Sequence, residues 1–257
     1  MSKRKFNAKE NGLNLREIDP LTDTQEDFFR AFYDDHFLVG MGTAGTGKSF
    51  LSMYLAYDAI INAHSTYNKL IICRSSVPSR DMGFLPGTEK EKMEVYRRPY
   101  IDITKELFGR GDAWEILEKK GTVEFVSTSF LRGSTLNNAI IFVDEIQNMA
   151  FNELHNVVTR VGKNSMLILT GDFFQMDLDS MESGVTDFYK IAKRVKKFKI
   201  INFTENDIVR NSFIKDYILA KNALDRERHN KENGNDAPKV NGVHVKQPVQ
   251  LSTPLFN

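Results

Sequence analysis

Short apolar runs alternate along this chain with stretches in which apolar residues recur at helical spacing. The apolar runs occur at residues 37–39, 69–74, 122–126, 139–143, 165–169 and 198–203. The run at residues 139–143 is continuous rather than alternating, which is typical of a strand covered on both faces of a parallel sheet. Helical patterns occur at residues 21–32, 49–63, 88–108, 114–119, 151–161, 185–195 and 212–223. This order predicts an α/β fold with a mostly parallel, twisted sheet and helices on both faces.

A glycine-rich segment joins the first apolar run to the helical pattern that follows it. Residues 42–49 spell GTAGTGKS and match G-x-x-x-x-G-K-[ST] without a mismatch. Glycines let successive N–H groups face phosphate oxygens, Lys48 adds a positive charge, and the Ser49 hydroxyl can ligate Mg²⁺. A plain turn between strand and helix is the alternative. We expect an ATP site formed by Gly42, Thr43, Ala44, Gly45, Thr46, Gly47, Lys48, Ser49 and Phe50.

Two adjacent carboxylates follow the apolar run 139–143. Asp144 and Glu145 would be costly at the end of a buried strand unless a cation meets them. Downstream of a phosphate loop, that cation is Mg²⁺ on a nucleotide. We therefore expect Ser49 and Asp144 to hold the metal ion, Asp144 directly or through water, and Glu145 to orient or deprotonate the attacking water. A polar strand end would be the better interpretation if the pair stood alone.

Three further residues are candidates because of their place relative to the phosphate loop. Gln25 precedes the loop, and its amide can both donate to and accept from an adenine edge. Gln175 follows a strand end and can reach the γ-phosphate or the lytic water. Arg210 precedes the last helical pattern and can serve as an arginine finger. An ordinary loop glutamine and a surface arginine capping a helix remain the alternatives for the last two.

Composition bears on whether the chain binds nucleic acid, uses cysteine chemistry, or belongs to the membrane or secreted proteins. The net charge is +1, so any surface that binds nucleic acid must be local. The candidate is the basic run Lys193, Arg194, Lys196, Lys197 and Lys199. The alternative is that this run is an ordinary solvated face. Cys73 is the single cysteine and is expected to be a buried apolar residue. No apolar stretch approaches the roughly 20 residues of a membrane span, and the N-terminus lacks a secretory pattern. A cytoplasmic protein is expected.

The polar ends of the chain predict three parts. Residues 1–20 are expected to form a solvated arm, residues 21–224 the nucleotide-binding domain, and residues 225–257 a flexible C-terminal tail. The stretch 250–256, QLSTPLF, regains apolar side chains. We interpret it as a docking peptide for a protein partner, loosely similar to the peptides that bind bacterial sliding clamps, with a frayed terminus as the alternative.

Taken in order, these motifs are similar to the RecA-like core of superfamily-one helicases, and more closely the chain resembles the PhoH (phosphate-starvation-inducible) family of P-loop ATPases. The resemblance runs over residues 21–210. It rests on the stretches 83–87 (GFLPG), 96–99 (YRRP), 131–139 (LRGSTLNNA), 143–148 (VDEIQN), 170–177 (TGDFFQMD) and 207–210 (DIVR). Ile146 stands where the family usually has alanine. So compact a version looks like a phage-encoded member, which would act in the host cytoplasm.

The resemblance implies Mg²⁺-dependent ATP hydrolysis, assembly into a ring such as a hexamer, and a role directed at RNA or another single-stranded nucleic acid. Such helicases use two RecA-like cores, whereas this chain has room for one. We therefore expect a ring in which Arg210 reaches the γ-phosphate held by a neighbouring subunit. The alternatives are an ATP-gated assembly module with little turnover and, less favoured, a small-molecule kinase. A GTPase is disfavoured because no Asn-Lys-x-Asp guanine reader is present.

Overall fold

The computed structural model describes residues 8, 11–62, 64–75, 89–131, 133, 135–172 and 184–232. The chain divides into two compact units, residues 1–215 and 216–257. The nucleotide-binding motifs all lie in the first. Among the described residues, no helix is both long and apolar enough to span a bilayer.

A six-stranded sheet, whose five strand pairings are all parallel, forms the centre of the first unit. The strands follow the predicted apolar runs, and their order across the sheet is β3-β2-β4-β5-β1-β6. Strand β5 thus separates β1, which leads into the phosphate loop, from β4, which ends at the two carboxylates. The strands are β1 (Phe37–Gly42), β2 (Lys69–Arg74), β3 (Val123–Ser127), β4 (Ala139–Val143), β5 (Met166–Gly171) and β6 (Phe198–Phe203).

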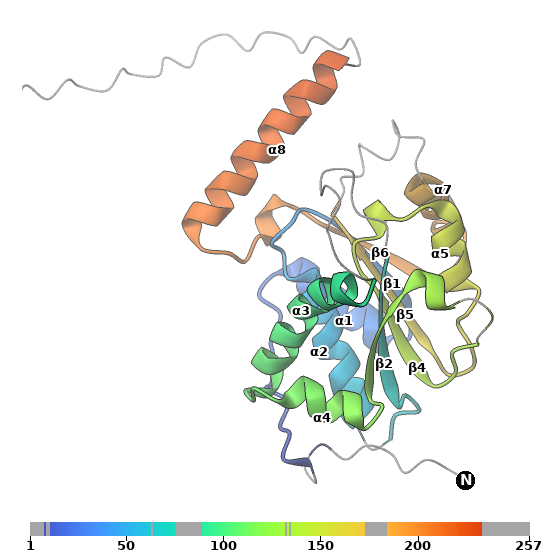
Figure 1. Ribbon diagram of the computed structural model, residues 1–257. Coiled ribbons are helices and arrows are strands. Elements are labelled where there is room, and N and C mark those ends of the chain that lie inside the picture. Colours follow the sequence, from blue (N-terminus) through green and yellow to red (C-terminus); the bar gives the residue numbers. More distant parts are fainter. Residues whose placement is uncertain are drawn as a thin grey trace, which may run out of the picture. The chain divides into compact units, whose positions relative to one another are not determined.

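Helices cover both faces of this sheet, as predicted (Figure 1). One face carries α1 to α4, and the other carries α5 and α7. The α-helices are α1 (Asp23–Tyr33), α2 (Lys48–Ile61), α3 (Glu89–Phe108), α4 (Ala113–Lys119), α5 (Phe151–Val158), α7 (Gly184–Ala192) and α8 (Ser212–Glu232), and short 3₁₀ helices are η2 (Thr128–Leu131), η3 (Ile146–Asn148) and η4 (Glu205–Asp207).

Alternate side chains of each strand enter two separate apolar cores. In β4, Ile140 and Phe142 join the core under α1 to α4, while Ile141 and Val143 join the core under α5 and α7. Cys73 belongs to the second core and is fully buried. The four inner strands β1, β2, β4 and β5 are buried on both faces, so the loops at their carboxyl ends start from a firmly packed part of the sheet.

Two boundaries differ from those expected from composition. Residues 11–20 are not a solvated arm, because Leu13 is only 1% exposed and the backbone N–H of Arg16 donates to Leu107 O at 2.8 Å. Helix α8 continues to Glu232, past the expected start of the tail at Asp225. Its last part is rich in good helix formers, and Lys221 pairs with Asp225 at 2.6 Å, so it needs no apolar face to be helical.

Candidate nucleotide site

The phosphate loop can adopt its path only with glycine at two positions. Gly42 has a φ of 116°, and a Cβ there would lie 1.9 Å from the carbonyl oxygen of Phe203. Gly47 caps the N-terminus of α2 in a left-handed conformation with a φ of 84°. The loop therefore wraps tightly around the start of α2, whose first free N–H groups and positive dipole end favour an anion.

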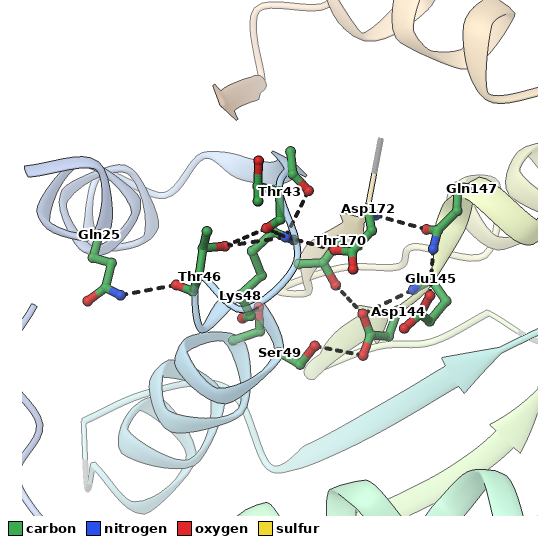
Figure 2. Close-up of polar contacts among 12 residues, drawn as sticks. Gln25, Thr43, Thr46, Lys48, Ser49, Asp144, Glu145, Gln147, Thr170 and Asp172 are labelled. Atoms are coloured by element: carbon green, nitrogen blue, oxygen red, sulfur yellow. Dashed lines mark hydrogen bonds and ion pairs between the residues drawn. The ribbon is translucent and has the colours of Figure 1, made fainter. Parts of the chain in front are cut away.

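Lys48 is held inside this loop. Its side chain is 5% exposed, and its Nζ donates to the carbonyl oxygens of Gly42 (3.1 Å) and Thr43 (2.8 Å) and to Thr46 Oγ1 (3.3 Å). The same ammonium pairs with Asp172 Oδ1 at 2.8 Å (Figure 2). The buried charge thus faces an anionic oxygen, the kind of group that a phosphate presents.

Asp144 lies opposite the loop and accepts four hydrogen bonds. Its Oδ2 accepts from Ser49 Oγ (2.8 Å) and Tyr100 Oη (3.1 Å), and its Oδ1 accepts from Thr170 Oγ1 (2.6 Å) and the N–H of Glu145 (3.0 Å). Thr170 can reach Asp144 because β5 lies between β1 and β4. Burial, and then the charge of Asp144, raise the pKa of Tyr100 well above its ordinary value, so its hydroxyl is the donor.

The pair formed by Ser49 and Asp144 suits Mg²⁺ bound together with phosphates. A hydroxyl and a carboxylate are hard oxygen ligands, and the serine oxygen keeps lone pairs while its O–H donates to Asp144. Within the described ranges, no group of three or more His, Cys, Asp or Glu side chains could hold a metal by itself.

Glu145 is held in a fixed orientation beside Asp144. Its backbone is left-handed, with a φ of 58°, which costs a non-glycine residue about 1–3 kcal/mol and is frequent at functional sites. Gln147 Nε2 donates to Glu145 Oε2 at 2.5 Å, and Gln147 Oε1 accepts from the N–H of Asp172 at 3.1 Å. Burial, and then the charge of Asp144, raise the pKa of Glu145. Gln147 therefore connects the carboxylate to the strand end that pairs with Lys48.

A cavity of about 660 Å³ brings these groups together. Its wall includes the phosphate loop, the two carboxylates and an apolar side formed by Ile18, Phe50 and Ile103. Arg74 and Arg210 of the same chain also line it. The volume is within the range of small-molecule sites, and cations, amides and carboxylates converge in it.

Arg210 is exposed. It follows a loop after β6 that is hydrogen-bonded to the phosphate loop through Val209 and to the start of α1 through Asp207. The N–H of Val209 donates to Gly45 O at 3.1 Å, which ties this loop to the phosphate loop. Burial alone would raise the pKa of Asp207, but hydrogen bonds from the Thr204 N–H and from the side chains of Thr22, Thr24 and Thr204 outweigh it and lower the pKa.

Gln25 makes contacts that the sequence did not indicate. It is 2% exposed, its Oε1 accepts from the Leu21 N–H at 2.7 Å, and its Nε2 donates to Thr46 O at 3.1 Å. The amide thus fastens the segment before α1 to the phosphate loop (Figure 2). One N–H and one lone pair of the amide remain for other partners.

Some predicted residues lie outside the described ranges, and some functional candidates were missed. Gln175 and the stretch 250–256 are not described. Tyr100, Gln147, Thr170 and Asp172 had no role assigned from the sequence, although all four contact the predicted site. Gln147, Thr170 and Asp172 lie inside the quoted stretches 143–148 and 170–177, and Tyr100 directly follows 96–99. The motifs therefore marked the right segments, but not the contacts that these side chains make.

Comparison with known proteins agrees with this fold. A family model described as PhoH-like protein matches residues 17–221. The chain is 32% identical over 216 residues to the PhoH-like protein of Bacillus subtilis (strain 168), covering 83% of this chain and 65% of that protein. It is 30% identical over 203 residues to Protein PhoH of Escherichia coli (strain K12), covering 77% and 57%. The chain therefore spans somewhat less than two thirds of the length of these relatives.

Among solved structures, the large terminase from a thermophilic bacteriophage matches with a TM-score of 0.50 and 13% sequence identity, covering 76% of this chain and 48% of the terminase. At that identity the likeness shows the fold alone, a RecA-like P-loop NTPase core. The family model covers most of the chain and includes every motif of the site that the structure describes. The chain belongs to the family of PhoH-like proteins.

Proposed function

We propose that this protein is a Mg²⁺-dependent ATP hydrolase that works as a homo-oligomeric ring on RNA or another single-stranded nucleic acid. The observation that carries the hydrolase part is the contact between Ser49 Oγ and Asp144 Oδ2 at 2.8 Å, with Glu145 beside it and Lys48 across the same cavity. Phosphate-binding groups, magnesium ligands and a candidate base thus meet in one place.

Each residue of the site has a separate role in the proposed hydrolysis. Loop amides and Lys48 hold the β- and γ-phosphates, and Ser49 and Asp144 hold Mg²⁺, which neutralises charge that develops on the phosphate oxygens. Glu145, oriented by Gln147, accepts the proton of the attacking water or positions that water. Asp172 leaves Lys48 when the phosphates bind, since both would compete for one ammonium.

The main alternative is an ATP-gated assembly module with little turnover. The fixed, left-handed Glu145 favours hydrolysis, because binding alone requires no strained carboxylate beside the metal ligand. A single-turnover experiment with γ-labelled ATP decides between them. Hydrolysis predicts label released as phosphate, a kinase predicts label on an acceptor, and an assembly module predicts label retained in ATP. Glu145→Gln is the control that should bind ATP but release no phosphate.

The nucleic-acid and ring parts rest on separate observations. The exposed basic side chains Lys193, Arg194 and Lys196 lie between α7 and β6, and exposed Lys199 lies in β6. Such a group can bind the phosphates of a nucleic-acid backbone. ATPase rates with and without single-stranded RNA or DNA, measured alongside the mass by light scattering, test both parts. Unchanged rates and a monomer at all concentrations would exclude them.

We propose that Arg210 completes the site of a neighbouring subunit. Because it also lines the cavity of its own chain, a mixing experiment is needed to separate the two routes. Arg210→Ala and Lys48→Ala subunits should each be inactive alone. If Arg210 acts across the interface, the mixture regains turnover, since an Arg210→Ala subunit with intact Lys48 then receives the arginine of a Lys48→Ala neighbour. No recovery would contradict the contact between subunits.

A further inference from the structure

Tyr100 contacts the site from an element that carries none of the nucleotide-binding motifs. It lies in α3, directly after Pro99, and its hydroxyl donates to Asp144 Oδ2 at 3.1 Å. This oxygen is the one that also accepts from Ser49 Oγ. Tyr100 therefore contacts the carboxylate at the oxygen that faces the other proposed magnesium ligand.

The ring of Tyr100 has little freedom to move. It is 1% exposed and packs against Phe142 with ring centroids 6.2 Å apart, nearly perpendicular at 86°, and against Phe125 at 5.5 Å. These two rings belong to β4 and β3, so the tyrosine is fixed against the same sheet that carries Asp144. The hydroxyl cannot follow a displaced carboxylate, which makes it a rigid reference point for Oδ2.

We propose that Tyr100 is a positioning residue for the magnesium ion, holding the Asp144 carboxylate in the rotation that lets it and Ser49 serve one ion. This inference rests on the proposed function, since it assigns a role toward the ion of that site. The Asp144 carboxylate accepts four hydrogen bonds, so it cannot turn without breaking some of them. When Ser49 oxygen contacts the ion, Tyr100 keeps Oδ2 in place from the other side.

A purely structural role of the Tyr100 hydroxyl predicts a different partner and no effect on Mg²⁺ affinity. A buried tyrosine hydroxyl needs a hydrogen-bond partner, and a backbone carbonyl satisfies that need. Here the partner is the carboxylate expected at the metal. Loss of such outer-shell partners typically lowers metal affinity by about 10- to 100-fold. Loss of an ordinary buried hydroxyl would lower stability and leave the response to Mg²⁺ unchanged.

The test is Tyr100→Phe in the full chain, which keeps the ring and removes only the hydroxyl. A fluorescent ATP analogue is titrated in EDTA and over a series of Mg²⁺ concentrations. We expect unchanged affinity in EDTA and a Mg²⁺ midpoint raised about tenfold or more, with tight binding restored at high Mg²⁺. An unchanged midpoint would overturn the inference. So would loss of binding in EDTA, because the hydroxyl would then support the phosphate loop rather than the ion.

Tyr57→Phe is the matched control. Tyr57 is also fully buried, and its hydroxyl shares a hydrogen bond of 2.9 Å with Thr104 Oγ1 of α3 rather than with Asp144. Thr104 Oγ1 in turn donates to the backbone carbonyl of Tyr100, so this control also reports any effect of loosening that turn of α3. It should lose a similar amount of thermal stability with no change of the Mg²⁺ midpoint; equal shifts in both variants would contradict the assignment. If the wild type binds the analogue equally in EDTA and Mg²⁺, the proposed function fails as well. If Mg²⁺ changes the binding of the analogue by the wild type, but Tyr100→Phe has the same Mg²⁺ midpoint, only the role assigned to Tyr100 is wrong.

Discussion

The ion pair between Lys48 and Asp172 predicts that one carboxylate competes with the nucleotide. Lys48 is 5% exposed and Asp172 is 40% exposed, and their charged atoms are 2.8 Å apart. Phosphates that bind Lys48 must displace Asp172 and then tolerate its negative charge nearby. Asp172→Asn removes both costs while the backbone N–H of residue 172 can still donate to Gln147. The variant should therefore bind ATP more tightly than the wild type.

The magnitude follows from the exposure of the pair. A hydrogen bond to a charged group contributes about 1.5–3 kcal/mol, and partial exposure of Asp172 reduces this to about 1–2 kcal/mol. At 1.4 kcal/mol for each factor of ten, ATP affinity should rise roughly 5- to 30-fold. The same loss should lower the stability of the nucleotide-free protein, because a buried ammonium then lacks its anionic partner.

Isothermal titration with ATP in EDTA measures this affinity without the contribution of Mg²⁺. Asp187→Asn is the matched control, because Asp187 is 68% exposed and its contact with Lys190 at 3.7 Å lies in α7. The control should change neither affinity nor stability. Weaker or unchanged binding by Asp172→Asn would refute the competition, since Asp172 would then support nucleotide binding or leave Lys48 freely available.

Four further outcomes are expected. Glu145→Gln should keep ATP affinity near that of the wild type and lower single-turnover phosphate release by about 10²- to 10⁴-fold, as loss of a general base does; wild-type release would remove Glu145 from the chemistry. Gly42→Ala should lower the free energy of unfolding by at least about 2 kcal/mol, because the φ of residue 42 is positive and the new Cβ would meet Phe203 O. The melting temperature should then fall by roughly 4–8 °C. An unchanged melting temperature would contradict the described path of the loop. Burial raises the pKa of the Cys73 thiol, so a disulfide reagent at pH 8 should label it only at the rate of unfolding, and immediate labelling of the native chain would contradict its burial. The pKa of Asp207 is lowered in the folded chain, so its contribution to stability is fully present above the ordinary aspartate pKa of about 3.9 and is lost as the pH falls through the lower folded pKa. The difference in stability between wild type and Asp207→Asn, measured by urea unfolding, should therefore shrink as the pH falls through that window. A difference that grows there would contradict this role.

The fold was largely predictable because its signals are local. The inner strands are nearly uninterrupted apolar runs and each helix has its own spacing, so element type and order followed from neighbours in the chain. The start of α1 is also set locally, because the side chain of Thr22 accepts a hydrogen bond from the N–H of Gln25. The segment 11–20 was mispredicted because its few apolar residues, such as Leu13, show no periodicity and are buried only by packing against α3 and its neighbours.

The site was predictable only as far as motifs reach. Lys48, Ser49 and Asp144 could be named because their residue types at fixed spacing imply their chemistry. The contact of Tyr100 with Asp144 spans 44 positions, and that of Lys48 with Asp172 joins the start of α2 to the residue after β5. Both depend on sheet order, which no local pattern encodes. Gln25 shows the opposite case: the sequence marked the residue, while its actual partners were visible only once the loop was placed.

ATP binding and hydrolysis by Lys48→Ala test the central claim most directly. If the buried ammonium holds the triphosphate, loss of about 3 kcal/mol of charged hydrogen bonds should weaken ATP binding by about 100-fold. Phosphate release should fall to the level of a reaction without protein. A Lys48→Ala chain that binds and hydrolyses ATP as the wild type does would contradict the account.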